Sequence, residues 1–117
     1  MYPITLDRER NLKYGMRNTS LIEKKFKKPI TKIDMDNLTM EETSIVLWAG
    51  LQHEDKSLTP DAVIDLVDDY TTYSEAVTVI MKALTLDMAG EEALAAMEKA
   101  MELELQGKKE SKKAKNE

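Results

Sequence analysis

Apolar residues recur at helical spacing over most of the chain, and the pattern is densest in its middle. Thr39-Met40-Glu41-Glu42 is a capping box, in which the Thr39 hydroxyl and the Glu42 carboxylate each accept a hydrogen bond from a free amide at a helix start. The two turns from Ile45 to Leu51 are apolar on nearly every face, which is typical of a buried helix. The pattern therefore predicts a central, buried helix over residues 40–52.

Three more helices are predicted after this one. Thr59-Pro60-Asp61 places an N-cap, a proline and an acid at the start of a helix over residues 60–70. Thr72-Tyr73-Ser74-Glu75 repeats the capping box before a helix over residues 73–89. Residues 91–106 are rich in Ala, Glu, Met and Leu, and we expect Gly107 to end this last helix. The predicted core consists of Leu47, Trp48, Leu51, Val63, Leu66, Ile80 and Leu84.

The first third of the chain is less regular. Apolar and polar residues alternate on both sides of Asp7-Arg8-Glu9, which predicts a short β-hairpin over residues 3–14. A frayed helix over residues 7–13 is the alternative, because the turn lacks an Asn-Gly or Asp-Gly pair. A helix over residues 18–27 should follow and stop before Pro29, and residues 29–38 should form a connecting loop. The candidate N-caps of the helix over residues 18–27 are Asn18, Thr19 and Ser20.

Length and composition limit the architecture. The 117 residues suffice for one domain, and with 5% aromatic residues the core must be built from aliphatic side chains and the eight methionines. We therefore expect a mainly α protein, a small orthogonal helical domain of four to five helices over residues 1–106, with a disordered Lys-rich tail over residues 107–117. The sequence has neither an apolar run long enough to cross a membrane nor the plan of a signal peptide at its start.

The net charge of −5 is distributed unevenly. Residues 1–32 carry nine basic and three acidic residues, residues 33–106 carry three basic and seventeen acidic ones, and residues 107–117 carry five lysines and two acids. Most simply, this is a solvated acidic surface with a basic tail. Such asymmetry otherwise affects solubility and the choice of partners rather than the fold.

Residues suited to catalysis or metal binding are few. The chain has no cysteine, and its single histidine, His53, falls at the expected end of the central helix, where a surface cap is the simpler interpretation. Asp34-Met35-Asp36-Asn37 lacks the further ligand and the glycine of a calcium loop. The four glycines are too scattered for a phosphate-binding loop. We therefore expect no enzyme, no cofactor and no metal site.

Two features point instead toward binding. The lysines at positions 24, 25, 27, 28 and 32 raise a nucleic-acid hypothesis, but the acidic pI of about 5.0 and the scarcity of aromatic residues argue against it. Met97 and Met101 lie on one side of the predicted last helix. They serve either as ordinary packing or as an adaptable surface for a partner helix, because unbranched thioether side chains repack easily.

The order of several short motifs resembles that of phage tail assembly chaperones. The motifs run from Ile4-Thr5-Leu6-Asp7 and Arg10-Asn11-Leu12-Lys13-Tyr14-Gly15, through Leu21-Ile22-Glu23-Lys24-Lys25, to Ile45-Val46-Leu47-Trp48-Ala49-Gly50-Leu51 and Leu58-Thr59-Pro60-Asp61. The chain is most similar to the branch shared with gene transfer agents and prophages of Gram-positive hosts. The resemblance covers about residues 4–70, with compatible helices to about residue 88.

This resemblance implies a protein that acts in the cytoplasm of the bacterial host during assembly of a long tail. It would bind the tape measure protein and the major tail tube protein, and also its own longer form made by ribosomal frameshifting, and it would be absent from the mature virion. The alternative is a small phage-encoded regulatory or nucleic-acid-binding helical protein. The candidate partner-binding residues are Leu21, Ile22, Phe26, Leu94, Met97, Met101 and Leu105.

Overall fold

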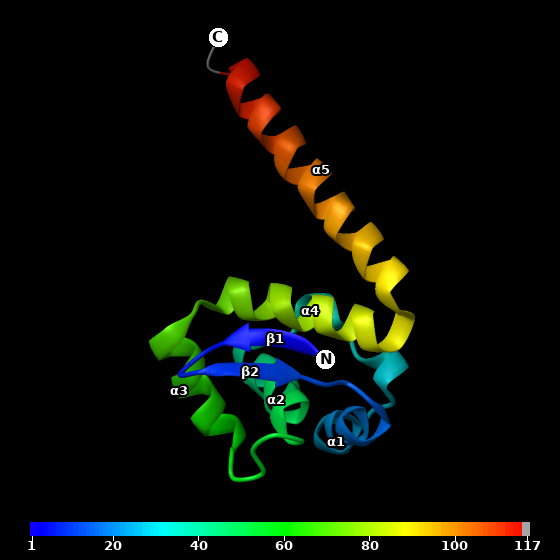
Figure 1. Ribbon diagram of the computed structural model, residues 1–117, viewed down its shortest axis with the longest axis vertical. Coiled ribbons are helices and arrows are strands. Elements are labelled where there is room, and N and C mark those ends of the chain that lie inside the picture. Colours follow the sequence, from blue (N-terminus) through cyan, green and yellow to red (C-terminus); the bar gives the residue numbers. More distant parts are fainter. Residues whose placement is uncertain (116–117) are drawn as a thin grey trace.

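A computed structural model describes the backbone of residues 1–115 and the side chains of residues 1–104 (Figure 1). The fold is mainly helical with an N-terminal antiparallel hairpin, as the sequence predicts. Its elements are β1 (Tyr2–Thr5), β2 (Glu9–Leu12), α1 (Met16–Phe26), the 3-10 turns η1 (Ile30–Lys32) and η2 (Met35–Asn37), α2 (Met40–Leu51), α3 (Pro60–Tyr70), α4 (Tyr73–Ala89) and α5 (Glu91–Lys115).

Side chains rather than a glycine turn hold the hairpin. The Asp7 carboxylate accepts two hydrogen bonds from the Arg10 guanidinium, at 2.9 and 3.0 Å, and Arg10 is only 5% exposed. Pro3 lies opposite Asn11 in the register, and the Asn11 amide donates to the Glu54 carboxylate at 2.6 Å. The Asn11 amide therefore points away from β1, and a proline opposite it leaves no hydrogen bond between the strands unmade. The hairpin is confirmed, and the frayed helix is wrong.

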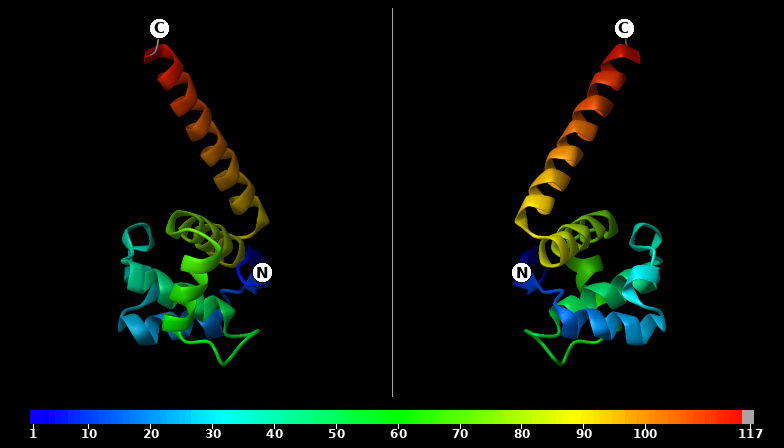
Figure 2. Two further views of the ribbon diagram at one scale, coloured as in Figure 1. Left: turned by 90° about the vertical axis from the view of Figure 1, so that its left-hand side faces the viewer. Right: turned by 90° about the vertical axis from the view of Figure 1, so that its right-hand side faces the viewer.

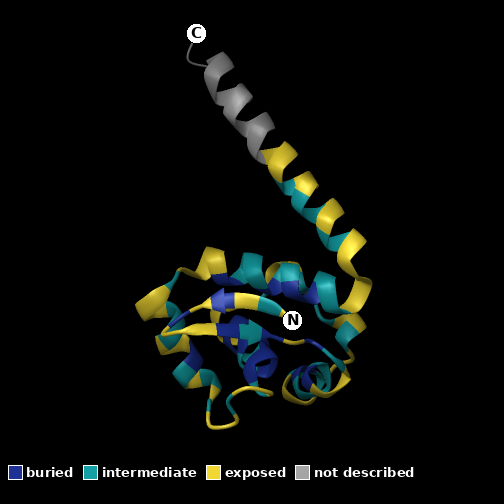
Figure 3. Cartoon of the chain, viewed as in Figure 1, coloured by how far each residue is buried: buried dark blue, intermediate teal, exposed yellow. Residues whose placement is uncertain are grey.

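Helix α2 lies at the centre, between the hairpin, α1, α3 and α4 (Figures 1 and 3). Seven of its twelve residues are buried, because its apolar side chains cover nearly the whole circumference. The Tyr14 ring packs directly against α2 at Gly50, where a Cβ atom would lie 2.7 Å from Cζ of Tyr14. The Tyr14 hydroxyl donates to the carbonyl of Val46 at 2.9 Å, and the Lys13 amide donates to the carbonyl of Gly50 at 2.9 Å. The predicted central helix is confirmed.

The predicted core is confirmed around α2. Leu47, Leu51 and Val63 are fully buried, and Ile80 is 1% exposed. Leu84 is 8% exposed. The two remaining residues, Trp48 and Leu66, are partly buried and pack against this cluster.

Helix α1 begins earlier than predicted. It starts at Met16 with Gly15 at the N-cap, so Asn18, Thr19 and Ser20 lie inside the helix rather than capping it. Asn18 is buried, and its side-chain amide donates to the carbonyl of Lys13 at 2.8 Å. This contact ties the helix to the end of the hairpin, and no side chain caps the start of α1 at Gly15. The expected loop over residues 29–38 contains the two 3-10 turns.

The other helix starts follow the local signals closely. Thr39 and Glu42 form the complete reciprocal capping box of α2. The Thr59 hydroxyl caps α3, and the Thr72 hydroxyl accepts from the Glu75 amide at the start of α4. Of the capping box predicted at Thr72, the hydrogen bond to the Thr72 hydroxyl is therefore present.

Helix α5 differs from the prediction at its end. It continues through Gly107 to Lys115, where the sequence predicted an end at Gly107 and a disordered tail over residues 107–117. A single glycine costs a helix only about 1 kcal/mol, and the following Lys, Glu and Ala residues are good helix formers. Residues 116 and 117 lie outside the described part of the chain.

Candidate partner-binding surface

The structure separates the seven predicted partner-binding residues into two groups. On α1, Ile22 is completely buried in the core, so its assignment to a binding surface is wrong. Leu21 and Phe26 are partly buried and pack against the same core. The apolar stripe of α1 was visible in the sequence, but the sequence did not show that α2 already covers it.

The second group lies on α5, which projects from the body of the molecule in all three views (Figures 1 and 2). The extents of 53 × 30 × 25 Å reflect this projection. Leu94, Met97 and Met101 are partly exposed, and we call these three residues the α5 stripe. The side chain of Leu105 lies outside the described residues. The α5 stripe is thus accessible to a partner, whereas Ile22 is not.

Next to the base of α5 lies an apolar groove that the sequence did not predict. It has a volume of about 290 Å³ and runs between the C-terminal half of α4 and the two 3-10 turns. We call it the methionine groove, because three methionines line it. Its lining consists of Ile30, Thr31, Met35, Met81, Leu84, Thr85 and Met88.

The methionine groove continues into the α5 stripe. The Thr85 side chain lines the groove, and its Oγ1 atom lies 3.3 Å from the sulfur of Met97. Met88, on the rim, is 56% exposed. With Met35 and Met81, four of the eight methionines of the chain gather on this surface. Methionine side chains are flexible and polarisable, so such a surface adapts to apolar side chains of different shapes.

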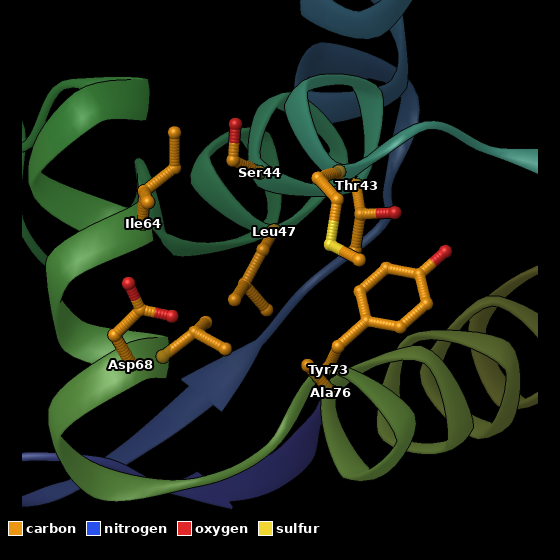
Figure 4. Close-up of a pocket in the computed structure, with 9 residues that line it drawn as sticks. Thr43, Ser44, Leu47, Ile64, Asp68, Tyr73 and Ala76 are labelled. Carbon is orange, nitrogen blue, oxygen red and sulfur yellow. The ribbon is translucent and has the colours of Figure 1, made fainter.

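A second, smaller pocket lies between α2, α3 and the start of α4, and we call it the three-helix pocket (Figure 4). Leu47 forms its floor, Tyr73 stands on one side, and the Asp68 carboxylate lies on the other (Figure 4). Its volume of about 80 Å³ is far below that of a typical small-molecule site. The Tyr73 hydroxyl donates to the carbonyl of Leu38 at 2.9 Å, which fixes this wall.

The shifted pKa values belong to the attachment of the hairpin rather than to either cavity. The Arg10 guanidinium lowers the pKa of Asp7 by direct hydrogen bonding. The pKa of Asp55 is lowered by hydrogen bonds from Ser57 and then from Arg10, and that of Glu54 by the Asn11 amide. Burial raises the pKa of the Tyr14 hydroxyl. These groups join the hairpin to the end of α2 and to the loop after it.

Metal binding and membrane insertion were also considered for the described part of the chain. Residues 1–104 contain no group of three His, Asp or Glu side chains close enough to hold a metal ion. His53 is exposed at the end of α2, and Asp34 caps η2 by accepting from the Asp36 amide at 3.2 Å. In the same described region, none of the helices is both long and apolar enough to cross a membrane.

The basic stretch lies at the end of α1 and just after it. Lys24, Lys25, Lys27 and Lys28 are all exposed. The Lys25 ammonium lies 5.4 Å from the centre of the Trp48 ring, within the range of a cation–π contact.

Comparisons of the chain with protein-family models, curated proteins and solved structures give no match.

Proposed function

We propose that this protein is a phage or prophage tail assembly chaperone. It binds the tape measure protein and the tail tube subunits during long-tail morphogenesis and is absent from the mature virion. The observation that carries the proposal is the methionine groove with the adjoining α5 stripe, an accessible apolar surface on an otherwise strongly charged protein. The order of motifs over residues 4–70 supports the particular class of chaperone.

The physical mechanism is helix-in-groove binding. A tape measure protein is a long helical chain whose apolar side chains would aggregate before the tail tube forms around it. An amphipathic helix presents such side chains at positions i, i+3, i+4 and i+7, and a groove lined by flexible methionines can accept many sequences of this pattern. The charged surface of the chaperone then keeps the complex in solution.

The test is co-expression of the chain with the tape measure protein encoded in the same genome. The proposal expects a larger soluble fraction of the tape measure protein and its co-purification with this chain. If neither the soluble yield nor the co-purification changes, the proposal fails. A gene for a major tail protein upstream and a long helical tape measure gene downstream are the expected genomic setting.

A matched pair of variants tests the surface itself. Met88→Glu puts a charge on the rim of the methionine groove, whereas Met16→Glu makes the same change at a 91% exposed position on α1. Met88→Glu should reduce co-purification at least about tenfold, the effect of about 1.4 kcal/mol, and Met16→Glu should leave it unchanged. Equal effects of the two substitutions would place the binding surface elsewhere.

The second candidate function is nucleic-acid binding by a small phage-encoded regulatory protein. The exposed lysines at positions 24, 25, 27 and 28 favour it, because clustered cations release counterions from a phosphate backbone. It predicts retention of DNA that weakens steeply with added salt. A gel-shift assay at low salt that shows no retention would exclude this function.

A further inference from the structure

The three-helix pocket gathers apolar side chains that the fold leaves exposed. Met40 is 67% exposed, Ile64 is 36% exposed and Tyr73 is 38% exposed. All three line the pocket, and Ile64 and Tyr73 flank it from α3 and α4 (Figure 4). An apolar cavity of about 150 Å³ can hold a benzene molecule, so the pocket volume of about 80 Å³ suits a single aliphatic side chain.

The polar groups of the pocket differ in whether they have a partner. The Thr43, Ser44 and Tyr73 hydroxyls each donate to a backbone carbonyl, at 2.8, 2.6 and 2.9 Å. The Asp68 carboxylate is the one charged group of the lining. It is exposed, and it forms no ion pair with another described residue. Asp68 is therefore open to a cation from outside the chain.

The helices around the pocket are acidic along their whole length. Residues 40–51, 60–70 and 73–81 contain seven acids and neither Lys nor Arg. On α3, three acids share one face with Ile64, because residues three and four positions apart lie side by side on a helix. These acids are Asp61, Asp65 and Asp68, and all three are exposed. Concentrated negative charge thus borders an apolar pocket.

The methionine groove has no such charge. Its two segments, residues 30–35 and 81–88, contain two lysines and two acids. The two cavities therefore offer apolar surface in different electrostatic surroundings. A basic partner is attracted to the three-helix pocket rather than to the groove, because charge complementarity selects the partner of an apolar contact.

We infer that the three-helix pocket binds a basic amphipathic helix of a partner protein. One apolar side chain of that helix fills the pocket, and Lys or Arg residues three or four positions away pair with Asp68 and with the other two acids of the same face. Exposed ion pairs alone are weak, and one apolar side chain alone is not selective, so binding needs both. The inference concerns a different surface from the methionine groove and does not rest on the proposed function.

The probe for the test is a labelled synthetic peptide of about 18 residues, or about five helical turns, with leucines at helical spacing and lysines elsewhere. A matched peptide carries glutamate at every lysine position. Fluorescence anisotropy with the full chain at physiological salt should show that the lysine peptide binds at least about tenfold more tightly. Equal affinities, or no binding of the lysine peptide up to about 1 mM, would overturn the inference.

A matched pair of charge variants locates the binding. Asp68→Lys reverses the charge in the pocket lining, and Asp69→Lys makes the same change at the next position, which does not line the pocket. Both positions are exposed, so neither change disturbs the core. Asp68→Lys should weaken binding of the lysine peptide at least about tenfold, and Asp69→Lys by less than about threefold, because salt screens charges that make no direct contact. Equal effects would mean general charge attraction and would overturn the inference.

A second pair tests the apolar contact. Met40 and Met16 are each the first residue of a helix, and only Met40 lines the pocket. Met40→Ala removes apolar surface from the pocket wall and should weaken binding about fivefold, whereas Met16→Ala should leave it unchanged. An unchanged affinity in Met40→Ala would overturn the inference. If the chain alone associates in sedimentation equilibrium and Asp68→Lys abolishes this association, a second copy occupies the pocket and the inferred partner is wrong.

Discussion

Helices α2 and α5 show how differently one chain uses the same secondary structure. Helix α2 has twelve residues, of which seven are buried, and every neighbouring element packs against it. Helix α5 has twenty-five residues, and none of its described side chains is buried. The middle of α2 carries no charge, whereas α5 carries Glu or Lys along most of its length. Tertiary packing therefore stabilises α2, while α5 depends more on its own helix propensity.

The strongest way to test this contrast is to shorten one leucine in each helix. Leu51→Ala removes a fully buried side chain next to the hairpin, and it should lower the free energy of unfolding by about 2–5 kcal/mol. Leu103→Ala, at a 60% exposed position of α5, should change it by less than about 0.5 kcal/mol. Urea unfolding followed by the fluorescence of Trp48 measures both. Equal losses would mean that α5 belongs to the core.

The glycines of the two helices should respond with opposite sign. Gly50→Ala would place a Cβ atom 2.7 Å from Cζ of Tyr14, and it should destabilise the fold by about 1–3 kcal/mol through overpacking. Gly107→Ala instead should stabilise α5 locally by up to about 1 kcal/mol, because alanine is the better helix former. Thermal unfolding monitors the first variant, and the helical signal in circular dichroism monitors the second. A stabilising Gly50→Ala would contradict the close approach of Tyr14 to α2.

Removal of the Thr39 hydroxyl from the capping box of α2 should have a smaller effect. Thr39→Ala leaves the Glu42 amide at the start of α2 without its partner, and it should cost about 1 kcal/mol. Thr39→Ser keeps the hydroxyl and should recover most of this loss. Urea midpoints of the two variants provide the comparison, and equal midpoints would show that the hydroxyl does not stabilise the helix.

The smallest expected effect is the pH dependence of the hairpin attachment. The folded-state pKa values of Asp7 and Asp55 lie below their ordinary values, so ionised Asp7 and Asp55 stabilise the fold above about pH 4. This stabilisation is lost as the pH falls through the lowered folded-state values. Asp55→Asn should therefore show a shallower loss of stability between pH 5 and about pH 3 than the unmodified chain. Glu104→Gln, at an exposed position of α5, is the control and should keep the full slope.

Much of the fold could be read from local patterns. Thr39, Thr59 and Thr72 mark helix starts that the structure reproduces, because a cap involves only residues within one turn. The apolar run of α2 likewise indicated its burial. The β-hairpin was predicted in spite of a turn without glycine, and the Asp7 and Arg10 side chains supply the missing turn stability.

The candidate site was less predictable. The apolar stripe of α1 gave no indication that Ile22 would be buried and that Lys24 and Lys25 would be exposed. The methionine groove joins residues 30–35 to residues 81–88, and no local pattern brings these segments together. Met97 was a candidate from its helical spacing, but its position beside Thr85 depends on the angle at which α5 leaves α4.

The sequence by itself determined the number of helices, the caps of α2, α3 and α4, the central place of α2 and the opposite charges of the two halves of α5, because these depend on neighbouring residues or on composition. Only the tertiary structure decided which apolar faces are covered and which stay open. Burial depends on the element that packs against a face, and that element comes from a distant part of the chain. The buried Ile22 and the open methionine groove show this difference within one small domain.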